Sequence, residues 1–152
     1  MTITNKIFSF PIRVYWEDTD AGGVVYHANY VRFLERARSE WLRGLGIGQH
    51  RLREDDDIVF AIRAMRLDFH APARLDDVLS ATIDTVDAGR ASLTFRQSLI
   101  RESDGKHLVD ADVRAACLVA STFRPRPLPR DLLPPGVLAA RDNQDSPTRV
   151  SE

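Results

Sequence analysis

Residues 30–47, YVRFLERARSEWLRGLGI, are the stretch that decides the fold. Asn29 is expected to cap the amino end of a helix here, and Gly44 is expected to end it. Apolar side chains recur every three or four positions, which is typical of a helix with one buried face. These side chains are Tyr30, Phe33, Leu34, Ala37, Trp41 and Leu42. The pattern predicts one amphipathic helix packed on a larger apolar surface.

Segments rich in β-branched and aromatic residues precede and follow this helix, and such segments favour strands. Gly89 and Gly105 mark hairpin turns between the later segments, while the polar stretch 49–57 is expected to form a loop. The expected strands are residues 11–17, 58–69, 78–87, 91–100 and 107–123. This order predicts an α+β domain with an antiparallel sheet of about five strands.

One helix cannot cover such a sheet. A helix of about 15 residues is roughly 22 Å long. Five strands span about 20 Å in width and run for about 25–35 Å. The strands carry apolar residues on more than one side, so a second copy of the chain is expected to cover the remainder.

The length and composition fit one globular domain. The chain has 152 residues, of which 43% are hydrophobic and 28% charged. Six of the eight prolines lie between Pro125 and Pro147, and proline cannot extend a sheet or a helix interior. A domain over residues 1–130 and a Pro-containing, flexible tail over residues 131–152 are therefore expected.

Cellular location and partner class are also constrained by composition. No apolar window approaches the roughly 20 residues of a membrane span, and the amino end does not resemble a signal peptide. The single cysteine, Cys117, excludes an intramolecular disulfide, so a cytoplasmic protein is expected. The 21 basic and 22 acidic residues give a net charge of -1, which argues against a nucleic-acid partner.

The densest chemical signal is EDTDAGGVVYH at residues 17–27. Aspartate and histidine are the side chains of general acid–base catalysis, and glycine lets a ligand approach the backbone closely. The start of a helix adds unpaired N–H groups suited to a developing oxyanion. Structural roles fit the same spacing: Asp18 or Asp20 can cap a turn, and His27 can be a hydrogen-bonded structural residue.

Other chemistries lack their motifs. Asp18, Asp20 and His27 have no second cluster with ligand spacing, so no metal is expected. The chain has no Gly-x-Ser-x-Gly nucleophile motif and no glycine-rich phosphate loop. Cys117 lies between Ala116 and Leu118 in an apolar segment and is interpreted as a core residue.

The segment VYWEDTDAGGVVYHANYVRFLERARSEWL, residues 14–42, closely resembles YbgC-type acyl-CoA thioesterases. This group belongs to the 4-hydroxybenzoyl-CoA thioesterase branch of the hotdog-fold superfamily. The segments MRLDFHAPARLDDVL at 65–79 and FRPRPLP at 123–129 are similar to later blocks of the same family. The resemblance implies a hotdog fold, a long central helix wrapped by an antiparallel sheet, in homodimers that often pair into tetramers.

The resemblance also implies residue roles in hydrolysis of an acyl-CoA to a carboxylic acid and free CoA. Asp20 matches the essential carboxylate, which attacks the thioester carbonyl or activates water. His27 matches an assisting position whose backbone N–H polarises the carbonyl oxygen. Glu35 matches a position that faces the acyl group in aryl-specific relatives, although a partly exposed helix residue fits this position better. Arg90 and Arg126 match basic positions near the nucleotide of CoA, although each also fits a solvated turn. No cofactor is expected beyond the coenzyme A of the substrate.

Two alternatives remain open at this stage. The chain could be a non-catalytic acyl- or CoA-binding protein, including a scaffold associated with the Tol–Pal envelope system to which the family is linked. It could also be a hotdog dehydratase that acts on an acyl-carrier substrate. Release of free thiol from a thioester separates these alternatives from a thioesterase.

Overall fold

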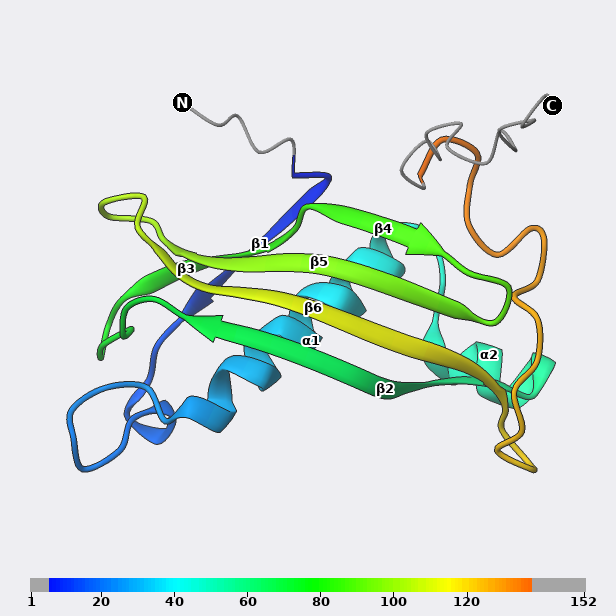
Figure 1. The fold of residues 1–152 in the computed structure, drawn as a ribbon, viewed down its shortest axis with the longest axis horizontal. Coiled ribbons are helices and arrows are strands. Elements are labelled where there is room, and N and C mark those ends of the chain that lie inside the picture. The colour runs from blue at the N-terminus through cyan, green and yellow to red at the C-terminus, as the bar shows by residue number, and fades with distance from the viewer. Residues whose placement is uncertain (1–5, 138–152) are drawn as a thin grey trace, which may run out of the picture.

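The computed structural model describes residues 6–137, which form one six-stranded antiparallel sheet and two α-helices (Figure 1). The elements are β1 (Phe8–Arg13), the 3-10 turn η1 (Trp16–Asp18), α1 (His27–Gly44), α2 (Gln49–Asp56), β2 (Ile58–Phe69), β3 (Val78–Ile83), β4 (Thr85–Ala88), β5 (Ser92–Arg101) and β6 (His107–Val119). The strand order is β1-β3-β5-β6-β2, and β4 pairs with β5. Consecutive strands mostly do not neighbour one another, yet every pairing is antiparallel.

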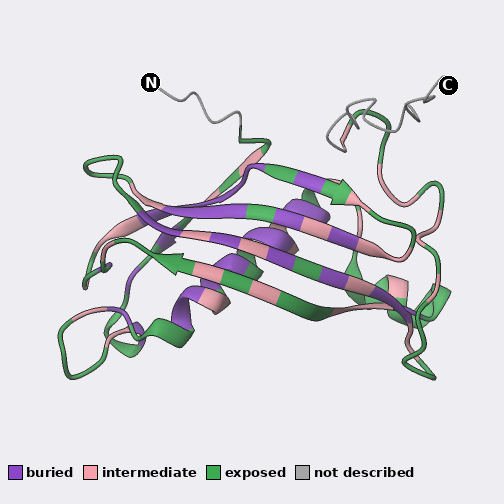
Figure 2. Ribbon diagram, in the orientation of Figure 1, coloured by how far each residue is buried: buried purple, intermediate pink, exposed green. Residues whose placement is uncertain are grey.

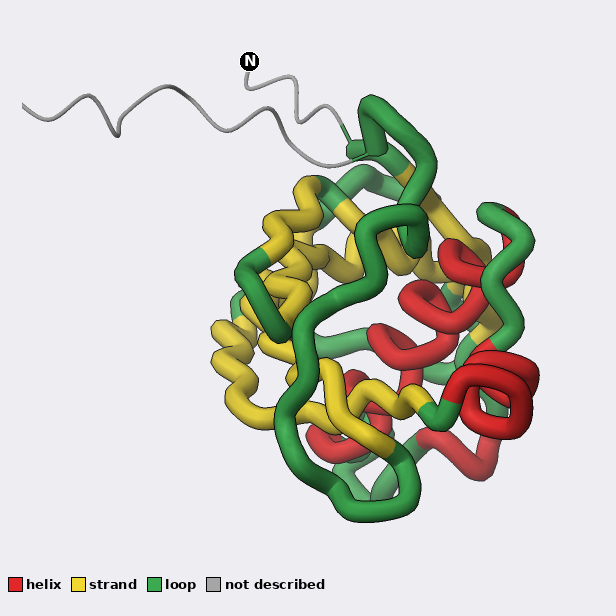
Figure 3. Tube along the Cα trace, turned by 90° about the vertical axis from the view of Figure 1, so that its right-hand side faces the viewer, coloured by secondary structure: helices red, strands yellow, loops and turns green. Residues whose placement is uncertain are grey.

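The long helix α1 lies along one face of the curved sheet. Figure 3 shows the strands on one side and the helices on the other. Alternate residues of β5 and β6, such as Phe95 and Val113, point toward the helix and are buried with Phe33 and Leu34 of α1. The predicted α+β fold with a central helix is therefore confirmed.

The sheet has six strands because the expected strand 78–87 breaks at Asp84, between β3 and β4. Asp84 is buried, and its carboxylate accepts hydrogen bonds from the hydroxyls of Thr82 and Ser98. Its backbone N–H donates to the carbonyl of Arg96 on β5. The chain therefore bends where a polar side chain turns inward, and β4 continues beside β5 alone.

The prediction for the start of α1 is wrong. The helix begins at His27, and Asn29 lies inside it and is buried. The Asn29 side-chain amide donates to the carbonyl of Asp18 at 3.0 Å. Asparagine favours helix caps, but here Asn29 holds the loop that precedes the helix. The predicted end at Gly44 is confirmed.

Two further predictions are wrong in part. Residues 49–56 form α2 instead of a loop, and this helix has no buried residue, so no apolar stripe marks it. The first strand covers 8–13 instead of 11–17, because Asp18 accepts the backbone N–H of Tyr15 and closes η1. The strands β2, β5 and β6 and the turns at Gly89 and Gly105 lie where the sequence predicts them, except that β6 ends at Val119.

Strand β2 is an edge of the sheet and is only partly covered. Figure 2 shows exposed and half-buried positions along its length. Two apolar side chains on it, Ile62 and Phe69, are 47% and 55% exposed. The helix α1 thus leaves part of the apolar surface of the sheet uncovered, as expected.

The carboxyl-terminal segment continues past the expected boundary at residue 130. Leu133 and Val137 are partly buried and pack against the core. The rest of the expected flexible tail, residues 138–152, lies outside the described residues. Within residues 6–137, no helix combines the length and the apolar character needed to cross a membrane.

Candidate active site

The motif loop is a tight turn that leads into α1. Thr19 and Val25 pair as an isolated antiparallel bridge. Inside it, the Asp20 N–H donates to the Val24 carbonyl at 2.9 Å, and the Gly23 N–H donates to the Asp20 carbonyl at 3.0 Å. These bonds hold Asp20 at one end of the turn, just ahead of the helix.

The Asp20 carboxylate is exposed and held by the loop itself. Its Oδ1 accepts the backbone N–H of Gly22 at 2.8 Å, while Oδ2 has no hydrogen bond to any residue between 6 and 137. Gly23 has φ +78°, which favours glycine. One oxygen is therefore oriented, and the other is available to a ligand or to water.

Asp18 has a structural role. It is 8% exposed, and its Oδ2 accepts the Tyr15 N–H at 2.8 Å. Its carbonyl accepts both the Tyr26 N–H and the Asn29 side-chain amide. Of the two aspartates that the spacing left equivalent, Asp18 fixes the loop and Asp20 faces solvent.

The amino end of α1 is uncapped. Tyr26 occupies the N-cap position without a side-chain hydrogen bond, and the first turn has no acidic residue. Helix amino ends carry a partial positive charge on their unpaired N–H groups. His27, the first helical residue, is exposed, and its ring lies against that of Tyr26 with centroids 4.5 Å apart. The site therefore has backbone donors directed away from the helix and a histidine beside them.

Tyr30 is a site residue whose polar end the sequence did not reveal. Its hydroxyl accepts the backbone N–H of Ala73 at 3.1 Å, and its ring lies 5.7 Å from that of Phe69 (centroid distance). Burial raises the pKa of Tyr30; the charges of Asp20 and Asp77 add to this, and the Ala73 hydrogen bond opposes it. Tyr30 thus joins α1 to the 71–77 turn, within electrostatic range of Asp20. The sequence offered one indication of this role: Tyr30 lies on the buried face of the predicted helix, and a buried tyrosine needs a hydrogen-bond partner for its hydroxyl.

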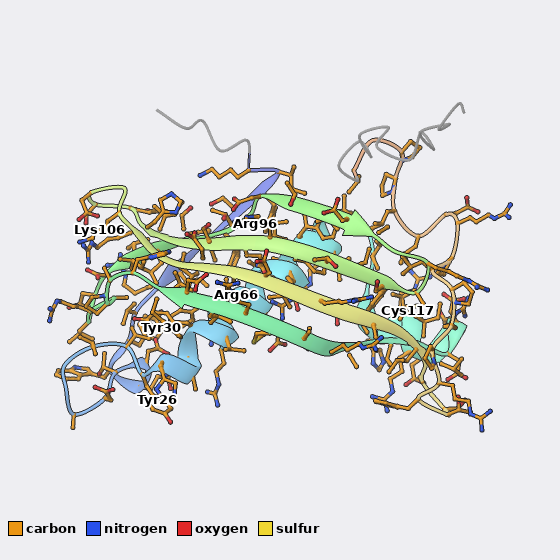
Figure 4. All side chains as sticks on the ribbon, in the orientation of Figure 1. Tyr26, Tyr30, Arg66, Arg96, Lys106 and Cys117 are labelled. Carbon is orange, nitrogen blue, oxygen red and sulfur yellow. The ribbon has the colours of Figure 1, made fainter. Side chains whose placement is uncertain are left out.

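The two predicted CoA-binding arginines lie at the other end of the sheet. The backbone N–H of Arg126 donates to the carbonyl of Cys117, and Arg126 lines a cavity of about 510 Å³. Arg90 lines an adjoining cavity of about 230 Å³ that shares Pro129 with the first. Figure 4 shows this separation, with Tyr26 and Tyr30 at one end of the sheet and Cys117 at the other. One chain does not bring Asp20 and Arg126 together.

The pairing of β2 with β6 gives the distance between the Asp20 end and the Arg126 end of the sheet. Phe69 of β2 contacts Tyr30, and Phe60 pairs with Cys117. Phe69 lies nine residue steps along β2 from Phe60, or about 30 Å at the usual rise of a β-strand. Glu35 lies at neither end; it is exposed and lines a third cavity, of about 390 Å³, beside α1.

The remaining predictions concern metals and the cysteine. Within residues 6–137, no three His, Cys, Asp or Glu side chains are grouped so that they could hold a metal ion. Cys117 is fully buried on β6, as predicted for a core residue. Burial raises the pKa of its thiol, which disfavours the reactive thiolate.

The sequence of this chain is similar to those of known thioesterases. Residues 14–139 match a family model described as the thioesterase-like superfamily. An acyl-CoA thioesterase YbgC of Haemophilus influenzae is 41% identical over 125 residues, which cover 82% of this chain and 90% of the relative. An acyl-CoA thioester hydrolase YbgC of Escherichia coli is 41% identical over 131 residues, or 86% of this chain and 96% of the relative.

Solved structures give the same fold. A probable thioesterase of Bartonella henselae has a TM-score of 0.74 and 35% identity, over 80% of this chain and 98% of that chain. A 1,4-dihydroxy-2-naphthoyl-CoA thioesterase of Synechocystis has a TM-score of 0.75 at 24% identity, over 80% of this chain and 89% of that chain; this shows the fold alone. The hotdog fold expected from the resemblance is confirmed.

Proposed function

The chain belongs to the thioesterase-like superfamily, and on that basis we propose that it is an acyl-CoA thioesterase. It hydrolyses an acyl-CoA thioester to a carboxylic acid and free CoA. The observation that carries the proposal is the position of Asp20, an exposed carboxylate held by its own turn directly ahead of the uncapped amino end of α1. The 41% identity to two acyl-CoA thioesterases over most of both chains supports it.

In the proposed reaction, the thioester oxygen faces the first backbone N–H groups of α1, among them that of His27. These donors stabilise the negative charge that develops as the carbonyl carbon becomes tetrahedral. The C–S bond then breaks, and the sulfur leaves with the electron pair and takes up a proton. Because the thioester is already an activated acyl group, no metal or redox cofactor is needed.

Asp20 has two possible roles in this scheme. As a general base, it takes a proton from the water that attacks the carbonyl carbon. As a nucleophile, it forms a mixed anhydride that water then hydrolyses. The free Oδ2 suits either role, because Oδ1 is occupied by Gly22. We propose that His27 assists by orienting the attacking water.

We infer that the active unit is a homodimer formed at the β2 edge. This edge is twelve residues long, and a long unpaired edge favours pairing with another chain. If two β2 strands pair in antiparallel fashion with their midpoints aligned, the Phe60 end of one strand lies beside the Phe69 end of the other. Arg126 of the partner subunit then lies toward the Asp20 loop, where it can meet the phosphates of CoA. Sedimentation of a monomer at assay concentration would contradict this arrangement.

The direct test is release of free thiol from a panel of acyl-CoA thioesters by the wild type and by Asp20→Asn. We expect turnover by the wild type and a loss of roughly two to four orders of magnitude in the variant, which is the usual effect of removing a general base. Circular dichroism and thermal unfolding establish that the variant is folded. Wild-type rates in Asp20→Asn would exclude Asp20 from the mechanism. A cytoplasmic location stays a prediction from the sequence.

A further inference from the structure

A cavity of about 390 Å³ lies between α1 and the sheet, apart from the Asp20 loop. Its walls are mostly apolar and include Val31 of α1, Met65 of β2 and Phe95 of β5. Two charged side chains, Glu35 and Arg38, also line it. Glu35 is exposed, whereas Arg38 is only 7% exposed. A buried cation in an apolar cavity is unfavourable unless a suitable partner satisfies it.

The protein partner of Arg38 is neutral. Arg38 Nη1 donates to Oε1 of Gln97 at 2.9 Å, and the guanidinium carbon lies 6.0 Å from the centre of the Phe95 ring. Gln97 is fully buried, and its Nε2 donates to the carbonyls of Leu34 and Thr82 at 3.2 Å. The glutamine is thus held with its oxygen toward Arg38. Within residues 6–137, no carboxylate forms an ion pair with Arg38 at 4.0 Å or less.

Two guanidinium nitrogens of Arg38, Nε and Nη2, have no hydrogen-bond acceptor among the described residues. Yet no fully enclosed side-chain nitrogen or oxygen in this part of the protein lacks a partner. These two nitrogens therefore retain access to open space, and Arg38 lines only this cavity among those described. Burial lowers the pKa of Arg38, and the charge of Glu35 opposes that effect; arginine stays charged in proteins in either case.

We propose that this cavity binds the acyl chain of the substrate and that Arg38 binds a carboxylate at its far end. The substrate class would then be CoA thioesters of dicarboxylic acids. This inference rests on the proposed thioesterase function. A carboxylate can accept two parallel hydrogen bonds from a guanidinium, whereas an alkyl tail would remove water from Arg38 and replace none of its hydrogen bonds.

The position of the cavity suits this role. It begins at Val31, about one helical turn from the His27 end where the thioester carbonyl is proposed to bind. Arg38 lies eleven residues after His27, or about 16 Å along the helix axis. Its side chain leans back toward the amino end, as helical side chains do. The distance excludes the shortest diacids and favours a chain of intermediate length.

The test compares acyl-CoA pairs of equal chain length, with and without the terminal carboxylate. Suitable pairs are succinyl- and butyryl-CoA, adipoyl- and hexanoyl-CoA, suberoyl- and octanoyl-CoA, and sebacoyl- and decanoyl-CoA. At the best length, we expect kcat/KM of the wild type to favour the carboxylated member by about tenfold or more, as one charge-assisted hydrogen bond would give. Arg38→Met should reduce that ratio to one or below, and Arg38→Lys should give an intermediate ratio. Arg32→Met, at an exposed position of the same helix, should keep the wild-type ratio.

A second readout does not depend on turnover. Free octanoate should raise the melting temperature of the wild type and of Arg32→Met more than octanamide does, because only octanoate carries a carboxylate, and Arg38→Met should lose this difference. Hydrolysis of all pairs without preference, together with equal melting shifts, would overturn the inference and leave the thioesterase function standing. If no thioester is hydrolysed, the proposed function fails, and the melting shifts alone decide whether the cavity binds a carboxylate. Arg38→Lys keeps the test decisive if Arg38→Met does not fold.

Discussion

Gly22 and Asp20 are in direct contact: the Gly22 N–H donates to Oδ1 of Asp20 at 2.8 Å, and a Cβ atom on Gly22 would lie 3.0 Å from that same oxygen. The first distance is a good hydrogen bond, and the second is too short for an ordinary carbon–oxygen contact. The loop therefore holds the carboxylate with a backbone donor that a side chain at the same position would disturb. The absence of a Cβ is what permits this orientation.

Gly22→Ala should slow hydrolysis without unfolding the protein. The added methyl group displaces the carboxylate, and a small misplacement of a catalytic group can cost about a hundredfold in rate. We expect a loss of about 10- to 100-fold in kcat from free-thiol assays. Gly44→Ala is the matched control, because a Cβ on Gly44 meets nothing within 4 Å and α1 ends there. Full activity in Gly22→Ala would show that the orientation of Asp20 is unimportant.

Removing the buried amide of Asn29 should destabilise the loop and the fold. Asn29→Ala deletes the donor to the Asp18 carbonyl at 3.0 Å. Loss of a buried hydrogen-bond partner costs about 1–3 kcal/mol. Urea denaturation should show a decrease of this size in the free energy of unfolding. Arg32→Ala, at an exposed position of α1, should change it by less than about 0.5 kcal/mol. Equal stabilities of the two variants would contradict the role of Asn29.

The arginines at the far end of the sheet should affect binding of the nucleotide and not the chemistry. Arg90→Ala and Arg126→Ala should each raise KM for an acyl-CoA by about tenfold, since a charge-assisted contact with phosphate is lost. KM for the acyl N-acetylcysteamine thioester, which has no nucleotide, should not rise. Steady-state kinetics with both substrates measure the difference. A parallel rise in both KM values would show that these residues support the structure of the protein and do not bind the nucleotide of CoA.

Acid should weaken the fold through Asp110. Partial burial raises the pKa of Asp110, but hydrogen bonds from Ser98, His70 and His107 outweigh it and hold that pKa below its ordinary value. Because the folded pKa is lowered, this contribution to stability is full above the unfolded pKa of about 3.9 and is lost as pH falls through the folded pKa.

As pH falls from 6 into the acid range, the free energy of unfolding should therefore decrease less for Asp110→Asn than for the wild type. Urea denaturation at each pH measures this decrease. Asp112→Asn is the control, because its carboxylate lies on the same strand and faces Arg96 at 3.6 Å while the Asp110 cluster remains intact. If Asp110→Asn and the wild type lose stability in parallel below pH 4, the cluster does not govern acid sensitivity.

The sequence predicted the elements that bury an apolar face. The stripe on α1 and the alternation in β5 and β6 record which side is buried, so the helix and the long strands could be located. The helix α2 has no buried residue and left no such record. Asn29 was misassigned because its residue type favours caps, whereas its partner, the Asp18 carbonyl, is known only from the fold.

The site was predictable only as far as the motif. The motif named Asp20 and His27, but spacing alone could not distinguish Asp20 from Asp18; the Tyr15 N–H makes that distinction. Arg38 and Gln97 are 59 positions apart, and no local pattern connects them. Interactions of this kind depend on topology, which a single sequence does not record.

The length of β2 has a consequence for how the protein behaves in the cell. With the Asp20 loop at one end of this strand and Arg126 at the other, the two parts of the proposed site come together only when two chains meet. At acyl-CoA concentrations below KM, specific activity per chain should then fall on dilution, as mass action requires, and recover on concentration. The abundance of the protein would itself set the fraction of chains that bind the CoA nucleotide with full affinity.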